Sequence, residues 1–172
     1  MVENETGAPR RRWRRKSLLI PAVLLTVAVI AAAVTTLILR TIEPSSGAQS
    51  VPPFTGLKYP TGVAVDGAGT VYVADELRGR VVTLAAGSSA QTVLPFTGLI
   101  GPDGVAVDGA GNVYVTDMGD RVVKLAAGSS TQTELRFHGL NQTTGIAVDR
   151  AGNVYVADAR NNRVVKLAAG SR

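Results

Sequence analysis

The chain has 172 residues, no cysteine and a formal net charge of +5 at pH 7. This length normally holds one domain with a short appendage, and the missing thiols exclude a disulfide framework, a thiolate metal site and a cysteine nucleophile. Residues 1–16 carry six Lys or Arg against two Glu, whereas residues 44–172 carry eleven Lys or Arg against ten Asp or Glu. A region so close to neutral excludes the basic surface that nucleic acids require, so we expect no nucleic-acid partner.

The first predicted element is a membrane-spanning helix at residues 18–39. This stretch, LLIPAVLLTVAVIAAAVTTLIL, contains no charged residue and as a helix would extend ~33 Å, enough to cross a hydrocarbon core of ~30 Å. The basic run RRRWRRK precedes it, and only Arg40 follows it directly. This asymmetry predicts a cytoplasmic N-terminus. We therefore expect a basic cytoplasmic tail at 1–17, a single-pass helix at 18–39, a linker at 40–49 and an extracytoplasmic region from residue 50, held at the cell membrane.

A cleaved signal peptide is the alternative to a retained anchor. Ser46, Gly47 and Ala48 are small residues at a spacing that a signal peptidase accepts. The apolar run is longer than the usual signal-peptide core of ~7–15 residues. The length therefore favours the retained anchor.

Three copies of one sequence unit fill residues 50–172. The equivalent glycines Gly62, Gly104 and Gly145 lie 42 and 41 residues apart, which divides the region into repeats at about 50–90, 91–131 and 132–172. A fixed period near forty, with several strand-like runs in each unit, is typical of β-propeller blades.

Each repeat is predicted to form four short strands, a to d, because β-branched and aromatic residues dominate every run. Strand a is expected at 63–66, 105–108 and 146–149, and strand b is the motif VYV(A/T)D. Strand c is RVV(K/T)L, and strand d is expected at 92–96 and 133–137. The D-G-A-G and D-R-A-G sequences between strands a and b are typical of hairpin turns.

The order of these strands predicts an incomplete ring. A d-type strand at Ser50–Phe54 precedes the first repeat, and the third repeat ends after its c strand, so the chain contains d, abcd, abcd, abc. Three blades are fewer than the ~4–8 of closed propellers, and an open arc would expose a sheet face and a strand edge at each end. We therefore expect a homodimer in which each Ser50–Phe54 strand completes the other chain's third blade, or pairing with another propeller of the same type.

The motif G-[VI]-A-V-D-x-A-G-[NT]-V-Y-V-[AT]-D, followed by R-V-V-[KT]-L, resembles the NHL repeat. The linking L-P-F-T-G-L and L-A-A-G-S segments are similar to those of extracytoplasmic sensor domains of mycobacterial receptor serine/threonine kinases. The resemblance implies an all-β fold of three NHL-type four-stranded blades, half of a six-bladed propeller, open or completed by a second chain, behind one transmembrane helix. Because only about 16 residues precede the span, we expect no kinase domain, and the implied role is sensing or binding.

Acidic and basic residues recur at fixed positions in the repeats. A binding or catalytic site has to be built only once, so recurrence in every copy indicates a structural role. We expect the first aspartate of each repeat to close the a–b turn, and the second to hold the b–c loop with a nearby arginine. These residues are Asp66, Asp108 and Asp149, then Asp75, Asp117 and Asp158 with Arg80, Arg121 and Arg163.

His138 is the single histidine of the chain. A metal-dependent propeller enzyme would need several His, Asp or Glu ligands that converge on one ion, and no G-x-S-x-G nucleophile motif is present. We therefore expect no catalytic residue, no metal and no cofactor. A metal-dependent hydrolase or lyase stays the enzymatic alternative, and a truncated receptor-ectodomain duplicate with little function is the third.

The positions that differ between repeats lie in the d–a and b–c loops, which share one face of a propeller. Their mixture of apolar and charged side chains suits a protein or glycan partner, although solvated loops that drift freely would look similar. We predict a membrane-anchored, non-catalytic sensor-like module that binds an unidentified extracellular ligand or protein through this face. The candidate residues are Lys58, Tyr59, Glu76, Leu77, Arg78, Ile100, Met118, Asp120, Asn141, Gln142, Arg160 and Asn161.

Overall fold

The computed structural model describes residues 49–171. The predicted cytoplasmic tail, the membrane-spanning helix and the linker up to residue 48 lie outside the described residues. Within residues 49–171, no helix is both long enough and apolar enough to cross a membrane. Residues Pro52–Arg172 form one compact unit.

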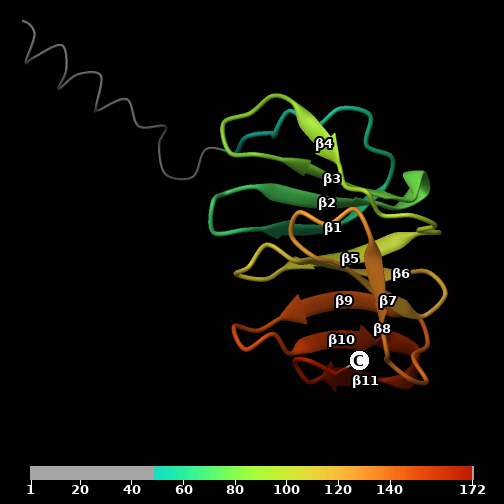
Figure 1. The fold of residues 1–172 in the computed structure, drawn as a ribbon. Coiled ribbons are helices and arrows are strands. Elements are labelled where there is room, and N and C mark those ends of the chain that lie inside the picture. Colours follow the sequence, from blue (N-terminus) through green and yellow to red (C-terminus); the bar gives the residue numbers. More distant parts are fainter. Residues whose placement is uncertain (1–48, 172) are drawn as a thin grey trace, which may run out of the picture. The chain divides into compact units, whose positions relative to one another are not determined.

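The compact unit is all-β and consists of three antiparallel sheets that follow one another in sequence order (Figure 1). Blade 1 contains β1 (Pro60–Val65), β2 (Val71–Asp75), β3 (Arg80–Leu84) and β4 (Gln91–Val93). Blade 2 contains β5 (Pro102–Val107), β6 (Val113–Asp117), β7 (Arg121–Leu125) and β8 (Gln132–Leu135). Blade 3 contains β9 (Thr143–Val148), β10 (Val154–Asp158) and β11 (Arg163–Leu167). The strands of each blade pair in the order in which they occur along the chain, as expected of propeller blades.

The b and c strands occupy the residues that the sequence predicts. The a strands begin three residues earlier than predicted, for example at Pro60 instead of Val63. The reason is a β-bulge: Pro60 pairs with Asp75 and Val63 with Val73, so β1 contains one more residue than β2 between these pairs. A bulge adds a residue that no alternating pattern reveals.

The d strands are shorter than predicted, and in the single chain Ser50–Phe54 forms no strand. After β4 the backbone turns, and the N–H of Phe96 donates to the carbonyl of Leu94 at 2.8 Å. The same turn occurs at Phe54, whose N–H donates to Pro52 at 2.8 Å. Residues 49–51 are exposed and belong to no strand. A strand requires a neighbouring backbone to satisfy its N–H and C=O groups, and this segment pairs with none of the described residues.

The hydrophobic core lies between consecutive blades. At the first junction, Tyr72 and Val81 of blade 1 pack in one cluster with Val115 and Val123 of blade 2. The second junction repeats this arrangement, with Tyr114 and Val122 of blade 2 among the side chains of blade 3. Each cluster also includes an aromatic and a leucine from the linker that joins the two blades, namely Phe96 with Leu99 and Phe137 with Leu140. Blade 2 therefore buries one face against blade 1 and the other against blade 3.

Each a–b turn is closed by its aspartate. Asp149 accepts hydrogen bonds from the N–H groups of Ala151 and Asn153, both at 2.9 Å, from the side-chain amide of Asn153 at 2.7 Å and from the hydroxyl of Tyr155 at 3.0 Å. The bonds from Asn153 contribute most to holding the pKa of Asp149 at about 2. Asp66 and Asp108 make equivalent turns, and their pKa values are also lowered.

The pKa of Asp149 predicts a loss of stability in acid. Because its pKa in the folded state lies below the unfolded value of 3.8, its contribution to stability is complete above pH ~4 and is lost as the pH falls towards 2. Replacing Asn153 by alanine removes the largest cause of the shift. The variant should show a higher pKa at Asp149, measured by NMR titration of the carboxyl carbon, and should unfold at a higher pH.

Asn141→Ala is the matched control. The backbone N–H of Asn141 donates a hydrogen bond to the carboxylate of Asp158, and alanine keeps this N–H. An Asn153→Ala variant with an unchanged carboxyl titration would contradict this account of the turn.

Candidate binding face

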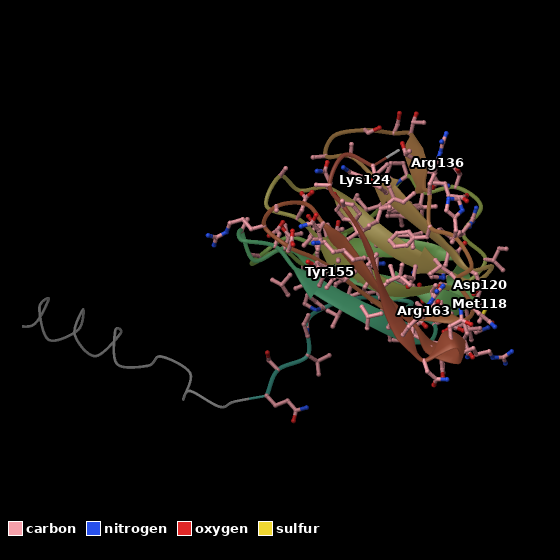
Figure 2. The ribbon with its side chains drawn as sticks, turned by 90° about the horizontal axis from the view of Figure 1, so that it is seen from below. Met118, Asp120, Lys124, Arg136, Tyr155 and Arg163 are labelled. Atoms are coloured by element: carbon pink, nitrogen blue, oxygen red, sulfur yellow. The ribbon has the colours of Figure 1, made fainter. Side chains whose placement is uncertain are left out.

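The b–c loops and the d–a linkers meet at one end of the blades. The b–c loops are the 3₁₀ turn Glu76–Arg78 in blade 1, residues 118–120 in blade 2 and the 3₁₀ turn Ala159–Asn161 in blade 3. The linkers contact them through backbone bonds, such as that from Met118 N–H to the carbonyl of Gly101 at 3.0 Å. In Figure 2, Met118 and Asp120 lie together near Arg163 and away from Tyr155.

The second aspartate of each repeat anchors this end of the blade. Asp117 is almost completely buried and accepts hydrogen bonds from the N–H groups of Ile100 and Gly101, both at 2.9 Å. It also forms an ion pair with Arg121 at 2.7 Å, and the same arginine donates to the carbonyl of Gly98. The linker from blade 1 is thereby fixed to blade 2. Asp75 with Arg80, and Asp158 with Arg163, hold the linkers that enter blades 1 and 3.

Asn161, a predicted binding residue, takes part in this anchor. Its side-chain amide donates to the carbonyl of Gly139 and to Asp158, both at 2.8 Å. Burial alone would raise the pKa of Asp158, but the hydrogen bonds from Asn161 and Arg163 hold the pKa below its usual value. Asn161 is exposed in its loop, and the structure shows that its side chain helps to hold the linker of blade 3.

A hollow of about 380 Å³ opens between these loops. Gln142 connects the loops of blades 2 and 3 at the edge of this hollow. Its backbone N–H donates to Asp120 at 2.5 Å, and its side-chain oxygen accepts from Arg160 at 2.8 Å. The structure brings six of the predicted binding residues together in this hollow: Glu76, Met118, Asp120, Asn141, Gln142 and Arg160. Gly119, in the same predicted loop as Met118 and Asp120, also lines the hollow, and two further lining residues were not predicted: Asp103 and Thr143. The hollow therefore combines contributions from all three blades.

Thr143 and Asp103 give the hollow its distinctive chemistry. Thr143 is only 7% exposed, and its Oγ1 is the one buried side-chain polar atom in residues 49–171 without a hydrogen-bond partner. Burial raises the pKa of Asp103, which also lines a second hollow of about 300 Å³ along the inner strands β1, β5 and β9. A buried hydroxyl without a partner is costly, so this atom is a natural place for a ligand group to bind.

A comparison of the repeats at equivalent positions would have identified both residues. Thr143 stands where the other repeats have Pro60 and Pro102, and Asp103 stands where they have threonine. Both positions fall at the start of strand a in the structure, before residues 105 and 146, where the predicted strands begin. The relevant signal was a change of residue type at a position that otherwise repeats.

The remaining predicted residues do not line the hollow. Tyr59, Leu77 and Ile100 are large apolar side chains on the same loops, and Ile100 is 71% exposed. Lys58 and Arg78 are exposed on the first of these loops. These residues add exposed apolar and basic side chains to the same loop face.

The described residues contain no group of three or more His, Cys, Asp or Glu side chains arranged to hold a metal ion. His138 is exposed on the linker between blades 2 and 3, away from the residues of the hollow.

Comparison with known proteins supports the interpretation of the repeat. The family model for the NHL repeat matches residues 140–167. The chain is also similar to the serine/threonine-protein kinase PknD of Mycobacterium tuberculosis, strains CDC 1551 and H37Rv, with 54% identity over 86 residues. That match covers 47% of this chain and 12% of the kinase. The chain therefore carries NHL-type propeller sequence that is related to a part of the kinase.

Solved structures show the same fold. A chain of a nidogen/laminin complex is 24% identical with a TM-score of 0.61, and the match covers 67% of this chain and 47% of that one. A virginiamycin B lyase from Staphylococcus aureus is 13% identical with a TM-score of 0.60, covering 72% of this chain and 43% of the lyase chain. Each match thus covers less than half of the length of these two solved chains.

Proposed function

We propose that this chain is an extracytoplasmic binding module, anchored by its predicted membrane helix, that recognises a ligand or protein partner through its loop face without catalysing a reaction. The observation that carries the proposal is the hollow, in which residues that differ between repeats surround the unpartnered hydroxyl of Thr143. The similarity to a part of PknD supports a sensor-like role.

The chemistry of the hollow favours a polar, uncharged or cationic ligand group. Glu76, Asp103 and Asp120 offer carboxylates, and Thr143 offers a hydroxyl without a partner. A hydroxyl or amide of the ligand would satisfy Thr143, while Met118 and Ile100 provide apolar contact at the rim. Recognition by a few placed polar groups within a partly apolar surface is typical of binding sites.

The orientation and the loop face can be tested together, because the chain has no native cysteine. Met118→Cys in the full chain should react with a membrane-impermeant maleimide on intact cells. When the maleimide carries a photoactivatable group, the cysteine should form a covalent adduct with a cell-envelope component upon illumination. The adduct should fall at least ~10-fold when Thr143→Val is added, because valine removes the hydroxyl that binds the ligand.

Ser129→Cys, in the turn between β7 and β8 at the opposite end of blade 2, is the control and should be labelled without forming the adduct. Protection of both cysteines until the membrane is permeabilised would overturn the outward orientation. Equal adducts at both positions would overturn the loop face as the binding site. Stoichiometric Ca²⁺ or Zn²⁺ in the purified chain would instead support the enzymatic alternative.

A further inference from the structure

The face of blade 3 that points away from blade 2 exposes a valine whose equivalents are buried at both interblade junctions. Val81 in blade 1 and Val122 in blade 2 are fully buried against the following blade. Val164 occupies the equivalent position in blade 3 and is 70% exposed. We call the surface of Val164 and Tyr155 the trailing face. It is an interblade surface without a neighbour among the described residues.

The first face of blade 1 is its complement. Val105 of blade 2 is buried at 6% exposure against blade 1, whereas the equivalent Val63 is 68% exposed. Val65 is also largely exposed, and Phe54 and Pro52 border the same hollow as Val63. We call this surface the leading face. The two faces are the two halves of the junction that the molecule already forms twice.

The outer edge of blade 3 also lacks a strand that the other blades contain. β3 pairs with β4, and β7 pairs with β8, whereas β11 has β10 as its only neighbour among the described residues. Gln49–Val51 matches the β4 sequence Gln91–Val93 at equivalent positions, and it is exposed and unpaired. An exposed strand edge is a template for an added strand.

We propose that the leading face and Gln49–Val51 of a second copy of this chain dock on the trailing face and on β11. The register follows from the pairs Val82 with Val93, Thr83 with Thr92 and Leu84 with Gln91. It places Val51, Ser50 and Gln49 of the second copy opposite Val165, Lys166 and Leu167. The added strand satisfies the free backbone groups of β11, and the faces bury their exposed valines.

Gln49 has a specific role in this junction. The side-chain amide of Gln91 accepts from Thr55 N–H at 3.0 Å and donates to its carbonyl at 2.9 Å. Gln132 makes the same pair of bonds with Thr97, at 2.9 and 2.8 Å. The equivalent linker position for blade 3 is His138, which is exposed. Gln49 of the second copy therefore binds the backbone of His138 and fixes the register.

The number of blades selects a second copy as the occupant. Closed propellers contain ~4–8 blades. Two copies of the three described blades give six, which lies within this range, whereas three copies would give nine. Since the two faces differ, the contact is head-to-tail, and such contacts form closed rings when the rotation between subunits closes. Two copies then form two identical junctions.

Disulfide trapping tests this register directly. One tagged full-length chain carries Ser50→Cys and a differently tagged chain carries Lys166→Cys, and the two are co-expressed and purified in mild detergent. Residues opposite each other in an antiparallel pair lie at a Cα distance of ~4.5–5.5 Å, which a disulfide spans. We expect a covalent species that carries both tags, at twice the chain mass of 17.8 kDa.

Lys124→Cys is the matched control, because Lys124 is the equivalent lysine of blade 2 and already pairs with Thr133 of β8. Replacing Lys166→Cys by Lys124→Cys should abolish the covalent product. An equal yield from Lys124→Cys would overturn the proposal, and so would a monomeric mass of the unmodified chain by light scattering.

Val164→Asp gives a second test that does not depend on disulfide formation. Val164 is exposed within one chain, so a charge there should leave the circular dichroism spectrum unchanged. It would be buried at the proposed junction, where an unpaired charge is strongly unfavourable, and association should weaken ~100-fold or more. Ile100→Asp, at a similarly exposed β-branched position on the loop face, should leave the dimer intact. A Val164→Asp chain that still forms the wild-type dimer would overturn the proposal.

Discussion

Replacing Asp117 by alanine is expected to lower the free energy of unfolding by about 2–4 kcal/mol, because the change removes a buried acceptor and leaves two backbone N–H groups and an arginine without their partner. Asp117 is 1% exposed. It accepts hydrogen bonds from two backbone N–H groups of the preceding linker and pairs with Arg121 at 2.7 Å. Alanine supplies none of these bonds, so Arg121 and the N–H groups of Ile100 and Gly101 lose their acceptor. The linker between blades 1 and 2 then loses its main attachment.

Urea denaturation of the full chain in detergent, followed by circular dichroism, measures this effect. Glu134→Ala is the control: Glu134 lies 3.9 Å from the same Arg121, but its side chain is 62% exposed. Exposed ion pairs contribute ~0–1 kcal/mol, so this variant should unfold almost as the wild type does. Similar decreases in the free energy of unfolding in the two variants would show that the attachment of the linker does not depend on burial of Asp117.

The b and c strands could be predicted to the residue because their alternation is uninterrupted. VYVTD and RVVKL pair across β6 and β7 from Val113 with Leu125 to Asp117 with Arg121 without a shift. The start of each a strand could not be predicted, because the bulge after Pro102 changes the register without changing the pattern. Ser50–Phe54 was predicted as a strand from its likeness to a d strand. Sequence likeness predicts the preference of a segment, whereas pairing depends on a neighbour in space.

The loop face could be predicted because antiparallel topology brings the d–a and b–c loops to one end. The hollow within it could be predicted only in part. Gln142 and Arg160 were expected from their variability. Thr143 and Asp103 were missed because they fall between the predicted loop residues and the predicted a strands, in the bulged starts of β9 and β5. The same positions belong to a strand in every blade, but the side chains at them differ between repeats. The residues shared by all repeats form the framework, and the exceptions at the starts of the a strands line the hollow.

The second large effect is expected from Gly104→Ala, which should lower the free energy of unfolding by about 2–3 kcal/mol through overpacking. Gly104 lies where the inner strands β5 and β9 approach each other. Its N–H donates to Thr116 Oγ1 at 2.7 Å, and that hydroxyl donates to the carbonyl of Thr144 at 2.7 Å. A Cβ on Gly104 would collide with the Thr144 carbonyl and lie 2.9 Å from Thr116 Oγ1. Backbone cannot move aside as a flexible side chain does, so the two blades must separate.

Gly145 is the equivalent residue of blade 3 and provides the matched comparison. A Cβ there would have only Ala157 Cβ within 4 Å, at an ordinary contact distance of 3.9 Å. Gly145→Ala should therefore leave the unfolding of a single chain nearly unchanged. In the proposed ring, the inner strand of the second copy would occupy the space beside Gly145, as Thr144 occupies it beside Gly104. The methyl group of Gly145→Ala should then abolish the dimer, as measured by light scattering. A dimer that tolerates Gly145→Ala would show that the inner strands of two copies do not meet there.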